Sequence, residues 1–231
     1  MLTQSEESCV KLKMDYEEFL EWSDEDVHAE WKEGEVVIHK PPKLIHQSVV
    51  EFLNKLIGFY VDLADSGKIT IAPFEVKLSP TGSAREPDLF FVAKENLSCL
   101  TQDRLNGPPD LVIEIVSKSS VKYDRDEKFK DYQQSGVREY WIIDPSPGKQ
   151  RADFYRLDHQ GVYRLYATED DETAGSEVIA GFWLRTDWLW QADTLNPLTC
   201  LFQIEGVMDA VRNQMEQVKI HCPEKQIGGV L

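Results

Sequence analysis

The stretch "PDLVIEIVSKSS", residues 109–120, decides the fold and raises the first functional question. Its apolar residues, from Leu111 to Val116, are mostly β-branched, with prolines before them and serines after them. Such a run is typical of a short strand inside a sheet. Glu114 stands in its middle, and burying a carboxylate costs on the order of several kcal/mol unless a positive group meets it. The rest of the chain must supply that cation, or a metal ion must.

The segments around this strand predict an α/β protein. Further strands are expected at residues 69–79, 88–93 and 139–144, with hairpins over 29–40 and 151–167 and an exposed acidic loop at 169–177. Helices are expected at 16–22, capped by Asp15, at 43–64, ended by Ser66 and Gly67, at 124–134, and at 206–220. Asp124 is the expected N-cap of the third helix and Gly136 its end. Irregular alternation of these elements predicts a mixed central sheet with helices on both faces.

Length and composition indicate one globular domain. The chain has 231 residues with 42% hydrophobic and 29% charged residues, enough to form a full core. Its four cysteines, at positions 9, 99, 200 and 222, are scattered, as expected for free thiols in a reducing compartment. The acidic first residues do not resemble a signal peptide, and no run approaches the roughly 18 apolar residues of a membrane span. We therefore expect a soluble, cytoplasmic protein that does not enter a membrane.

The net charge of −16 argues against nucleic acid as a partner, but its distribution weakens that objection. Residues 1–35 carry a net charge of −9 and residues 151–231 a net charge of −6, whereas residues 36–150 are nearly neutral at −1. Within this neutral middle, "SKSSVKYDRDEKFK" concentrates five basic residues. The acidity therefore lies in the flanks, and binding of nucleic acid stays open.

Two carboxylates on adjacent predicted strands form the first candidate site. Asp88 opens the strand of "REPDLFFV", and Glu114 lies inside the strand of "DLVIEIV". Mg²⁺ is commonly held by one or two carboxylates and keeps several waters, one of which can be activated for attack. Asp124, Lys128 and Tyr132 follow at i, i+4 and i+8, so they share one face of the expected helix.

At this point the chain resembles a known family. The strings "EWKEGE", "HQSVVEFL", "APFEVKL", "REPDLFFV", "PPDLVIEIVSKSS" and "YDRDEKFKDYQQSGVREYWIIDP" occur in the order typical of the Uma-two family of restriction endonuclease-like proteins, part of the PD-(D/E)xK nuclease superfamily. The resemblance runs from about Asp15 to about Leu189. It implies a restriction-endonuclease-like α/β/α fold with a mixed central sheet, and a Mg²⁺- or Mn²⁺-dependent endonuclease that cleaves DNA or RNA.

The resemblance also implies roles for individual residues. Asp88 and Glu114 match the two acidic motif positions, and the carbonyl of Ile115 would be a third metal ligand. The motif lysine is missing two residues after Glu114, where Val116 stands, and Lys128 matches the position from which the following helix supplies it. Glu30 matches a further acidic position, as a ligand or base. The expected contacts to the nucleic-acid backbone are Lys118, Lys122, Arg125 and Lys130.

Each residue also has a structural interpretation. Glu114 could pair with a buried cation, Asp88 could simply open a strand, and Asp124 with Lys128 could be a solvated helix pair. His46 could lie at a helix start or contact substrate, and Tyr132 could pack in the core. Two other functions stay open: a catalytically silent scaffold that binds a protein partner, and a hydrolase of a small phosphodiester.

The expected organisation is an N-terminal extension over 1–14, a nuclease-like domain over 15–192, and a C-terminal helix and tail over 193–231 that pack on the same domain. Homodimerisation is plausible only by analogy with other nucleases of the superfamily.

Overall fold

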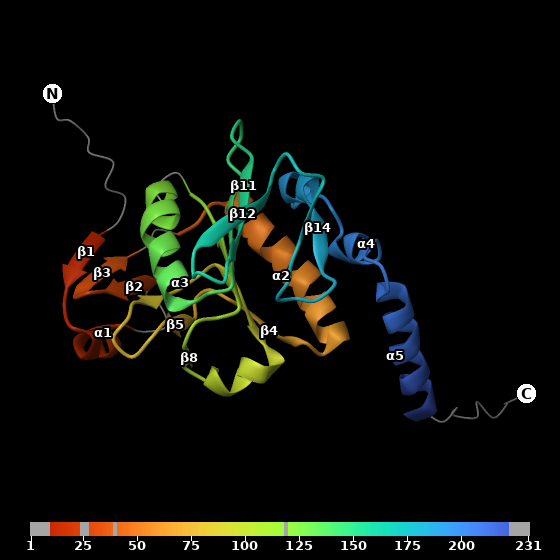
Figure 1. Ribbon diagram of the computed structural model, residues 1–231, viewed down its shortest axis with the longest axis horizontal. Helices are drawn as coiled ribbons and strands as arrows, with labels where there is room; N and C mark the ends of the chain where they lie inside the picture. The colour runs from red at the N-terminus through yellow and green to blue at the C-terminus, as the bar shows by residue number, and fades with distance from the viewer. Residues whose placement is uncertain (1–9, 24–27, 39–40, 118–119, 222–231) are drawn as a thin grey trace, which may run out of the picture.

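The computed structural model describes residues 10–23, 28–38, 41–117 and 120–221; for residue 10 and residues 218–221 it describes the backbone only. Figure 1 shows a layered α/β body, with α2 on one side of the central sheet, α3 on the other, and α5 extending away near the C-terminus.

The central sheet has six strands in the order β12-β11-β10-β9-β7-β4. They are β4 (Gly67–Ile71), β7 (Leu89–Ala93), β9 (Leu111–Ile115), β10 (Glu139–Asp144), β11 (Arg151–Leu157) and β12 (Tyr163–Thr168). The pair β9–β10 is parallel and the other neighbours are antiparallel. The predicted mixed central sheet, with "LVIEIV" in its interior, is confirmed.

Helices cover both faces of this sheet. On one face α2 (Leu44–Ala64) packs through Leu53, Leu56 and Ile57 against the odd-numbered residues of β7 and β9. On the other face the even-numbered residues pack against α3 (Phe129–Ser135), which continues η2 (Tyr123–Lys128), a π-helical segment. The period of two along each strand separates these two cores. The result is the α/β/α arrangement that the resemblance implied.

A second six-stranded sheet was not expected. Its order is β1-β3-β2-β6-β5-β8. The strands are β1 (Val10–Lys13), β2 (Ala29–Lys32), β3 (Glu35–Ile38), β5 (Glu75–Lys77), β6 (Ala84–Arg85) and β8 (Arg104–Asn106). The hairpin of β2 and β3 is confirmed, and Glu33 and Gly34 at its turn both have positive φ. Helix α1 (Tyr16–Trp22) begins at Asp15 with a capping box, also as predicted.

The remaining described elements are short apart from the last helix, and those from β13 onward contribute to the core on the α2 side. They are β13 (Thr173–Gly175), β14 (Trp183–Arg185), the 3₁₀ helices η1 (Lys94–Cys99) and η3 (Thr186–Gln191), and the helices α4 (Pro197–Leu201) and α5 (Val207–His221). The acidic segment 169–177 is therefore a loop only in part, since β13 pairs with β14. No helix within the described ranges is long and apolar enough to cross a membrane. Cys99 is exposed and Cys200 is buried, and both are free; Cys9 and Cys222 lie outside the described residues.

Two predicted elements need correction. The strand expected over 69–79 is two strands, β4 and β5, which belong to different sheets and are separated by Pro73. Proline has no N–H to donate to a strand ladder, which favours such a break. The helix expected to start at Asp124 already runs through positions 121 and 122, so Asp124 lies inside it. Its predicted end is right, because Gly136 adopts a left-handed conformation there. The proposed division of the chain into three parts stays a prediction.

Candidate active site

The carboxylate of Glu114 faces the helix layer formed by η2 and α3. Along β9, Ile113 and Ile115 pack on the α2 side of the sheet, whereas Val112 and Val116 pack on the α3 side. Glu114 is an even-numbered position like Val112 and Val116, so its side chain points to the same α3 side, and the residue is only 2% exposed. The burial inferred from its apolar flanks is therefore confirmed, and its charge must be balanced by groups on the helix.

Lys128 supplies that positive group. Its Nζ lies 2.9 Å from Oε1 of Glu114, 2.9 Å from Oε1 of Glu30 and 3.7 Å from Oδ1 of Asp124. Tyr132, one turn further on, donates its hydroxyl to the same Glu114 oxygen at 2.8 Å. The shared helix face predicted for Asp124, Lys128 and Tyr132 is therefore present, and Tyr132 does more than pack.

Asp88 lies across from Glu114 at the start of β7. Leu89 pairs with Ile113, so the antiparallel register brings Asp88 opposite Glu114. Its Oδ2 accepts the N–H of Ile115 at 2.7 Å and lies 3.1 Å from Nε2 of His46 in the first turn of α2. The N–H and C=O of one strand residue point to the same neighbour, so the carbonyl of Ile115 also faces the Asp88 side.

Glu30 is held on every side. Its Oε1 accepts the N–H of Glu86 at 3.0 Å in addition to the ammonium of Lys128. Its Oε2 accepts the hydroxyl of Tyr123 at 3.0 Å and Nη1 of Arg85 at 3.2 Å. Both oxygens of Glu30 are therefore engaged by protein donors, and its role as a ligand or base stays a prediction.

Arg85 is a residue that the sequence analysis missed. It is completely buried. It donates Nη1 to Glu30 and also donates Nε to Oδ2 of Asp131 at 3.1 Å. Asp131 also accepts from Ser83 at 3.0 Å and from Lys32 at 2.8 Å. This chain of contacts ties β2 and β6 of the second sheet to α3. The only signal in the sequence was a charged residue three positions before Asp88 in "REPD".

The charges in this cluster do not balance. Burial raises the pKa of Glu114 well above its ordinary value, and the charges of Asp88, Asp124 and Glu30 add to that effect against Lys128. Burial also raises the pKa of Asp124 to about 6. Burial alone would lower the pKa of Lys128, but Glu114, Glu30 and Asp124 raise it well above its ordinary value, so it stays an ammonium ion. A further cation beside these carboxylates would be stabilised.

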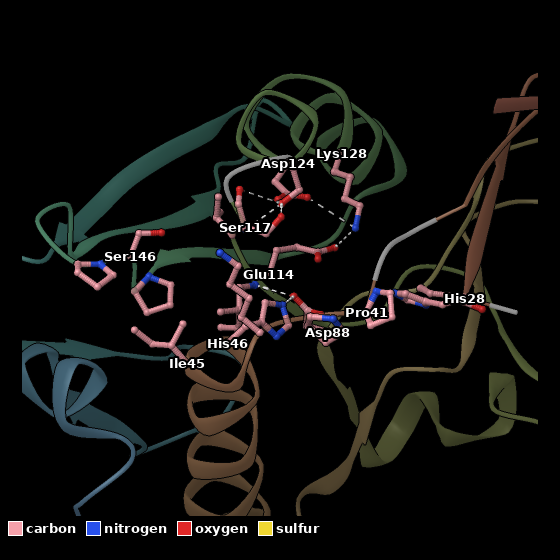
Figure 2. Close-up of a pocket in the computed structure, with 18 residues that line it drawn as sticks. His28, Pro41, Ile45, His46, Asp88, Glu114, Ser117, Asp124, Lys128 and Ser146 are labelled. Carbon is pink, nitrogen blue, oxygen red and sulfur yellow. Dashed lines mark hydrogen bonds and ion pairs between the residues drawn. The ribbon is translucent and has the colours of Figure 1, made fainter. Parts of the chain in front are cut away.

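The cluster opens into a cavity of about 470 Å³. Figure 2 shows Asp88, Glu114, Asp124 and Lys128 around it, with His46 on α2 and His28 on the opposite side. His28 contacts Glu86, and although burial would lower the pKa of His28, that carboxylate raises it. Asp124, which the sequence predicts to be a helix N-cap, is buried and lines this cavity. The cavity wall also includes Lys43 and Ser146.

The donors fit a hard divalent cation. The hydrogen bonds of Asp88 and Glu114 engage Oδ2 and Oε1, which leaves the second oxygen of each carboxylate available. No group of three His, Cys, Asp or Glu side chains in the described part of the chain forms a complete metal cluster. A cation here would therefore rely on two carboxylates, the Ile115 carbonyl and water, a set that suits Mg²⁺.

The predicted nucleic-acid contacts do not gather at this cavity. Arg125 is bound to Asp153, and neither Lys122 nor Lys130 lines the cavity, although both are exposed. Lys118 lies outside the described residues. Lys43 at the cavity wall is an exposed cation that the sequence analysis did not consider.

Comparisons with known proteins agree with this architecture. The model of the Uma2 family, described as "Putative restriction endonuclease", matches residues 16–187. Among solved structures, a protein from Anabaena variabilis described as a "putative nuclease" of the DUF820 group superposes with a TM-score of 0.63. Its identity to this chain is 16%, over 76% of this chain and 97% of the other. A comparison with curated proteins found no match.

The fold is therefore that of a restriction-endonuclease-like α/β/α protein, with a buried lysine–carboxylate cluster between the interior strand β9 of its central sheet and the helical layer of η2 and α3. The chain belongs to the Uma2 family. The family resemblance read from the sequence motifs is confirmed.

Proposed function

We propose that this protein is a Mg²⁺- or Mn²⁺-dependent endonuclease, a phosphodiester hydrolase that acts on DNA or RNA. The observation that carries the proposal is the ammonium of Lys128, held 2.9 Å from both Glu30 and Glu114 beside a cavity that Asp88 also lines. Family membership supports the choice of nucleic acid as the substrate.

Asp88, Glu114 and the carbonyl of Ile115 would hold the ion. When bound, the ion supplies Lewis-acid chemistry: it polarises a phosphate oxygen and lowers the pKa of a water molecule. His46 fixes the Asp88 carboxylate through the contact at 3.1 Å. Ile115 holds the same Asp88 oxygen through its N–H, so the carboxylate is oriented before an ion arrives.

Lys128 would stabilise the charge that develops on the phosphate oxygens and orient the attacking water. Its position does not depend on the strand after Glu114, where Val116 replaces the lysine of the superfamily motif. It depends instead on Glu30, whose other oxygen is held by Arg85 and Tyr123. Removing one preorganised donor of this kind typically lowers a reaction rate by about 10²- to 10³-fold.

The substrate backbone would enter along the cavity wall formed by the start of α2. The first turn of this helix contains no acidic residue, and its N-cap residue, Lys43, makes no side-chain capping bond. A helix N-terminus favours a phosphate group. Lys43 is therefore added to Lys122 and Lys130 as a proposed phosphate contact.

A nuclease assay tests the proposal directly. The purified chain should cleave single-stranded DNA, duplex DNA or RNA with Mn²⁺ or Mg²⁺, and not with EDTA. Asp88→Asn, Glu114→Gln and Lys128→Met should each lower the rate by about 10²-fold or more. Lys55→Met, an exposed lysine paired with Glu51 on α2, is the matched control and should keep full activity. Circular dichroism should show that all variants fold.

Two results would contradict this function. A wild-type chain that cleaves no nucleic acid and binds no Mn²⁺ would support the silent scaffold. Cleavage of bis(4-nitrophenyl) phosphate without cleavage of any nucleic acid would support a hydrolase of small phosphodiesters.

A further inference from the structure

A second space adjoins the cavity of the candidate active site. Its volume is about 270 Å³, and it lies between the start of α2, the turn after β10 and the segment of η3. Ile45, Pro145 and Pro147 line both spaces. Figure 2 shows Ile45 and Ser146 at the end of the first cavity that lies away from His28. We call this second space the apolar hollow.

The walls of the apolar hollow are ring and aliphatic side chains. Trp190 of η3 contributes an indole ring that is only partly buried, and Pro145 and Pro147 contribute pyrrolidine rings. Leu44 lines the same space and is 83% exposed, although it is apolar. An apolar and aromatic lining of this kind is typical of a site that takes a flat organic group.

The charges of the two spaces differ in a way that suits a polynucleotide. Lys43 and Lys128 line the first cavity. Among the described residues that line the apolar hollow, the one charged side chain is the acidic Asp193, and Ser48 and Gln150 are the polar ones. The first cavity therefore favours a phosphate group, whereas the apolar hollow disfavours an anion and accepts an uncharged group with polar edges.

The two spaces are also close enough for one strand to occupy both. His46, which contacts Asp88, and Val49, which lines the apolar hollow, are three residues apart on α2. That separation is about 4.5 Å along the helix axis. Successive phosphates on one strand of DNA are already about 3.4 Å apart along its axis. A phosphate beside Asp88 would therefore have its neighbouring base within reach of the apolar hollow.

We propose that the apolar hollow is a base-binding subsite, in which an unpaired base next to the scissile phosphate stacks on Trp190. A base inside a duplex is paired and stacked, so it reaches such a subsite only from a single strand or after extrusion from the helix. The substrate is therefore single-stranded nucleic acid. This inference rests on the proposed nuclease function and adds the substrate class to it.

Cleavage of matched oligomers by the full chain with Mn²⁺ tests the proposal. The substrates are oligothymidylate, oligouridylate, an oligothymidylate–oligoadenylate duplex, and a tetrahydrofuran abasic oligomer of equal length. The abasic oligomer carries the same phosphates without bases. The kcat/KM for the better of the two single strands should exceed that for the abasic oligomer and for the duplex by about 5- to 150-fold, the range expected for stacking of one base on an aromatic side chain.

Variants of the apolar hollow separate base binding from a structural effect. Trp190→Leu should lower kcat/KM for the single strand by about 5- to 150-fold and leave cleavage of the abasic oligomer unchanged, whereas Trp190→Phe should retain most of the activity. Leu44→Asn changes an exposed side chain and should lower the same value by about 3-fold or more. Leu165→Asn, at an exposed leucine of β12, is the matched control and should have no effect. Circular dichroism and thermal melting should show that all four variants fold.

Two results would overturn the subsite while the nuclease function stands. One is equal kcat/KM for the single strands, the duplex and the abasic oligomer. The other is an equal loss for the single strand and the abasic oligomer in Trp190→Leu, which would mean that Trp190 only supports the fold.

A chain that cleaves none of the oligomers would instead contradict the nuclease function. Fluorescence anisotropy with the same oligomers, labelled with fluorescein, then decides the subsite. Weaker binding of the single strand by Trp190→Leu than by the wild type would support it, and equal binding would overturn it.

Discussion

A single carboxylate inside a strand accounts for much of the polar structure around it. Glu114 is tolerated because Lys128 and Tyr132 both bind one of its oxygens, at 2.9 and 2.8 Å. Lys128 in turn carries a single positive charge but has three acidic neighbours. Removing one member of such a buried set leaves another charge without a partner, which is more costly than the net value of the pair.

Asp124 provides a test of this charge imbalance. Its pKa is about 6 in the folded protein because of burial, against an ordinary value of 3.8. The stability that it contributes is therefore fully present below about pH 4 and is lost as the pH rises through about 6. Asp124→Asn keeps the size and shape of the side chain but removes its negative charge. In EDTA, its free energy of unfolding relative to the wild type should increase by up to about 3 kcal/mol between about pH 4 and pH 7.5. Urea denaturation at several pH values measures this, and parallel pH profiles of the two proteins would contradict it.

At the scale of elements, strand alternation and helix register bring the site together. The antiparallel pair β7–β9 sets Asp88 across from Glu114, and the parallel pair β9–β10 buries that position from the other side. Lys128 then reaches Glu114 from the end of η2, a π-helical segment, and such segments are frequent at functional sites. Two strands and one helix therefore have to keep their register for the site to exist.

Two glycines test how closely these elements pack. A Cβ on Gly67 of β4 would lie 2.2 Å from the carbonyl oxygen of Val92 and 2.6 Å from the ring of Phe91. Gly67→Ala should therefore destabilise the protein by about 1–3 kcal/mol or more. A Cβ on Gly58 of α2 meets nothing within 4 Å, so Gly58→Ala should stabilise by about 0.5–1 kcal/mol. Chemical denaturation should give these opposite signs, and a neutral Gly67→Ala would show that β4 can move away from β7.

At the scale of the whole molecule, metal binding and folding should be linked. An ion that binds only the folded chain stabilises it by about 2.7 kcal/mol at a concentration of one hundred times its dissociation constant. For a protein of this size we expect the melting temperature to rise by about 5–10 °C with Mn²⁺. Asp88→Asn should lose this rise, whereas Lys55→Met should keep it, with NaCl used to match ionic strength. An equal rise in Asp88→Asn would mean that the ion binds elsewhere.

The sequence by itself determined the layered fold and the two principal carboxylates. The period of two in the strands, the apolar face of residues 43–64 and the capping at Asp15 are local patterns, and local patterns are legible in one chain. Glu114 stood out for the same reason, since a charge inside an apolar run is a local contradiction. Lys128 was singled out because the family resemblance matched it to the motif lysine, whereas its helical spacing to Asp124 and Tyr132 indicated only a shared helix face.

Only the tertiary structure decided how these residues are used. Arg85, Glu30 and Asp131 come from distant parts of the chain, and only packing of the second sheet against α3 brings them together. Asp124 reads as a helix cap because capping is a local preference, yet the helix begins earlier and buries it. Contacts between residues far apart in the chain depend on which surfaces are buried together, and no local pattern records that.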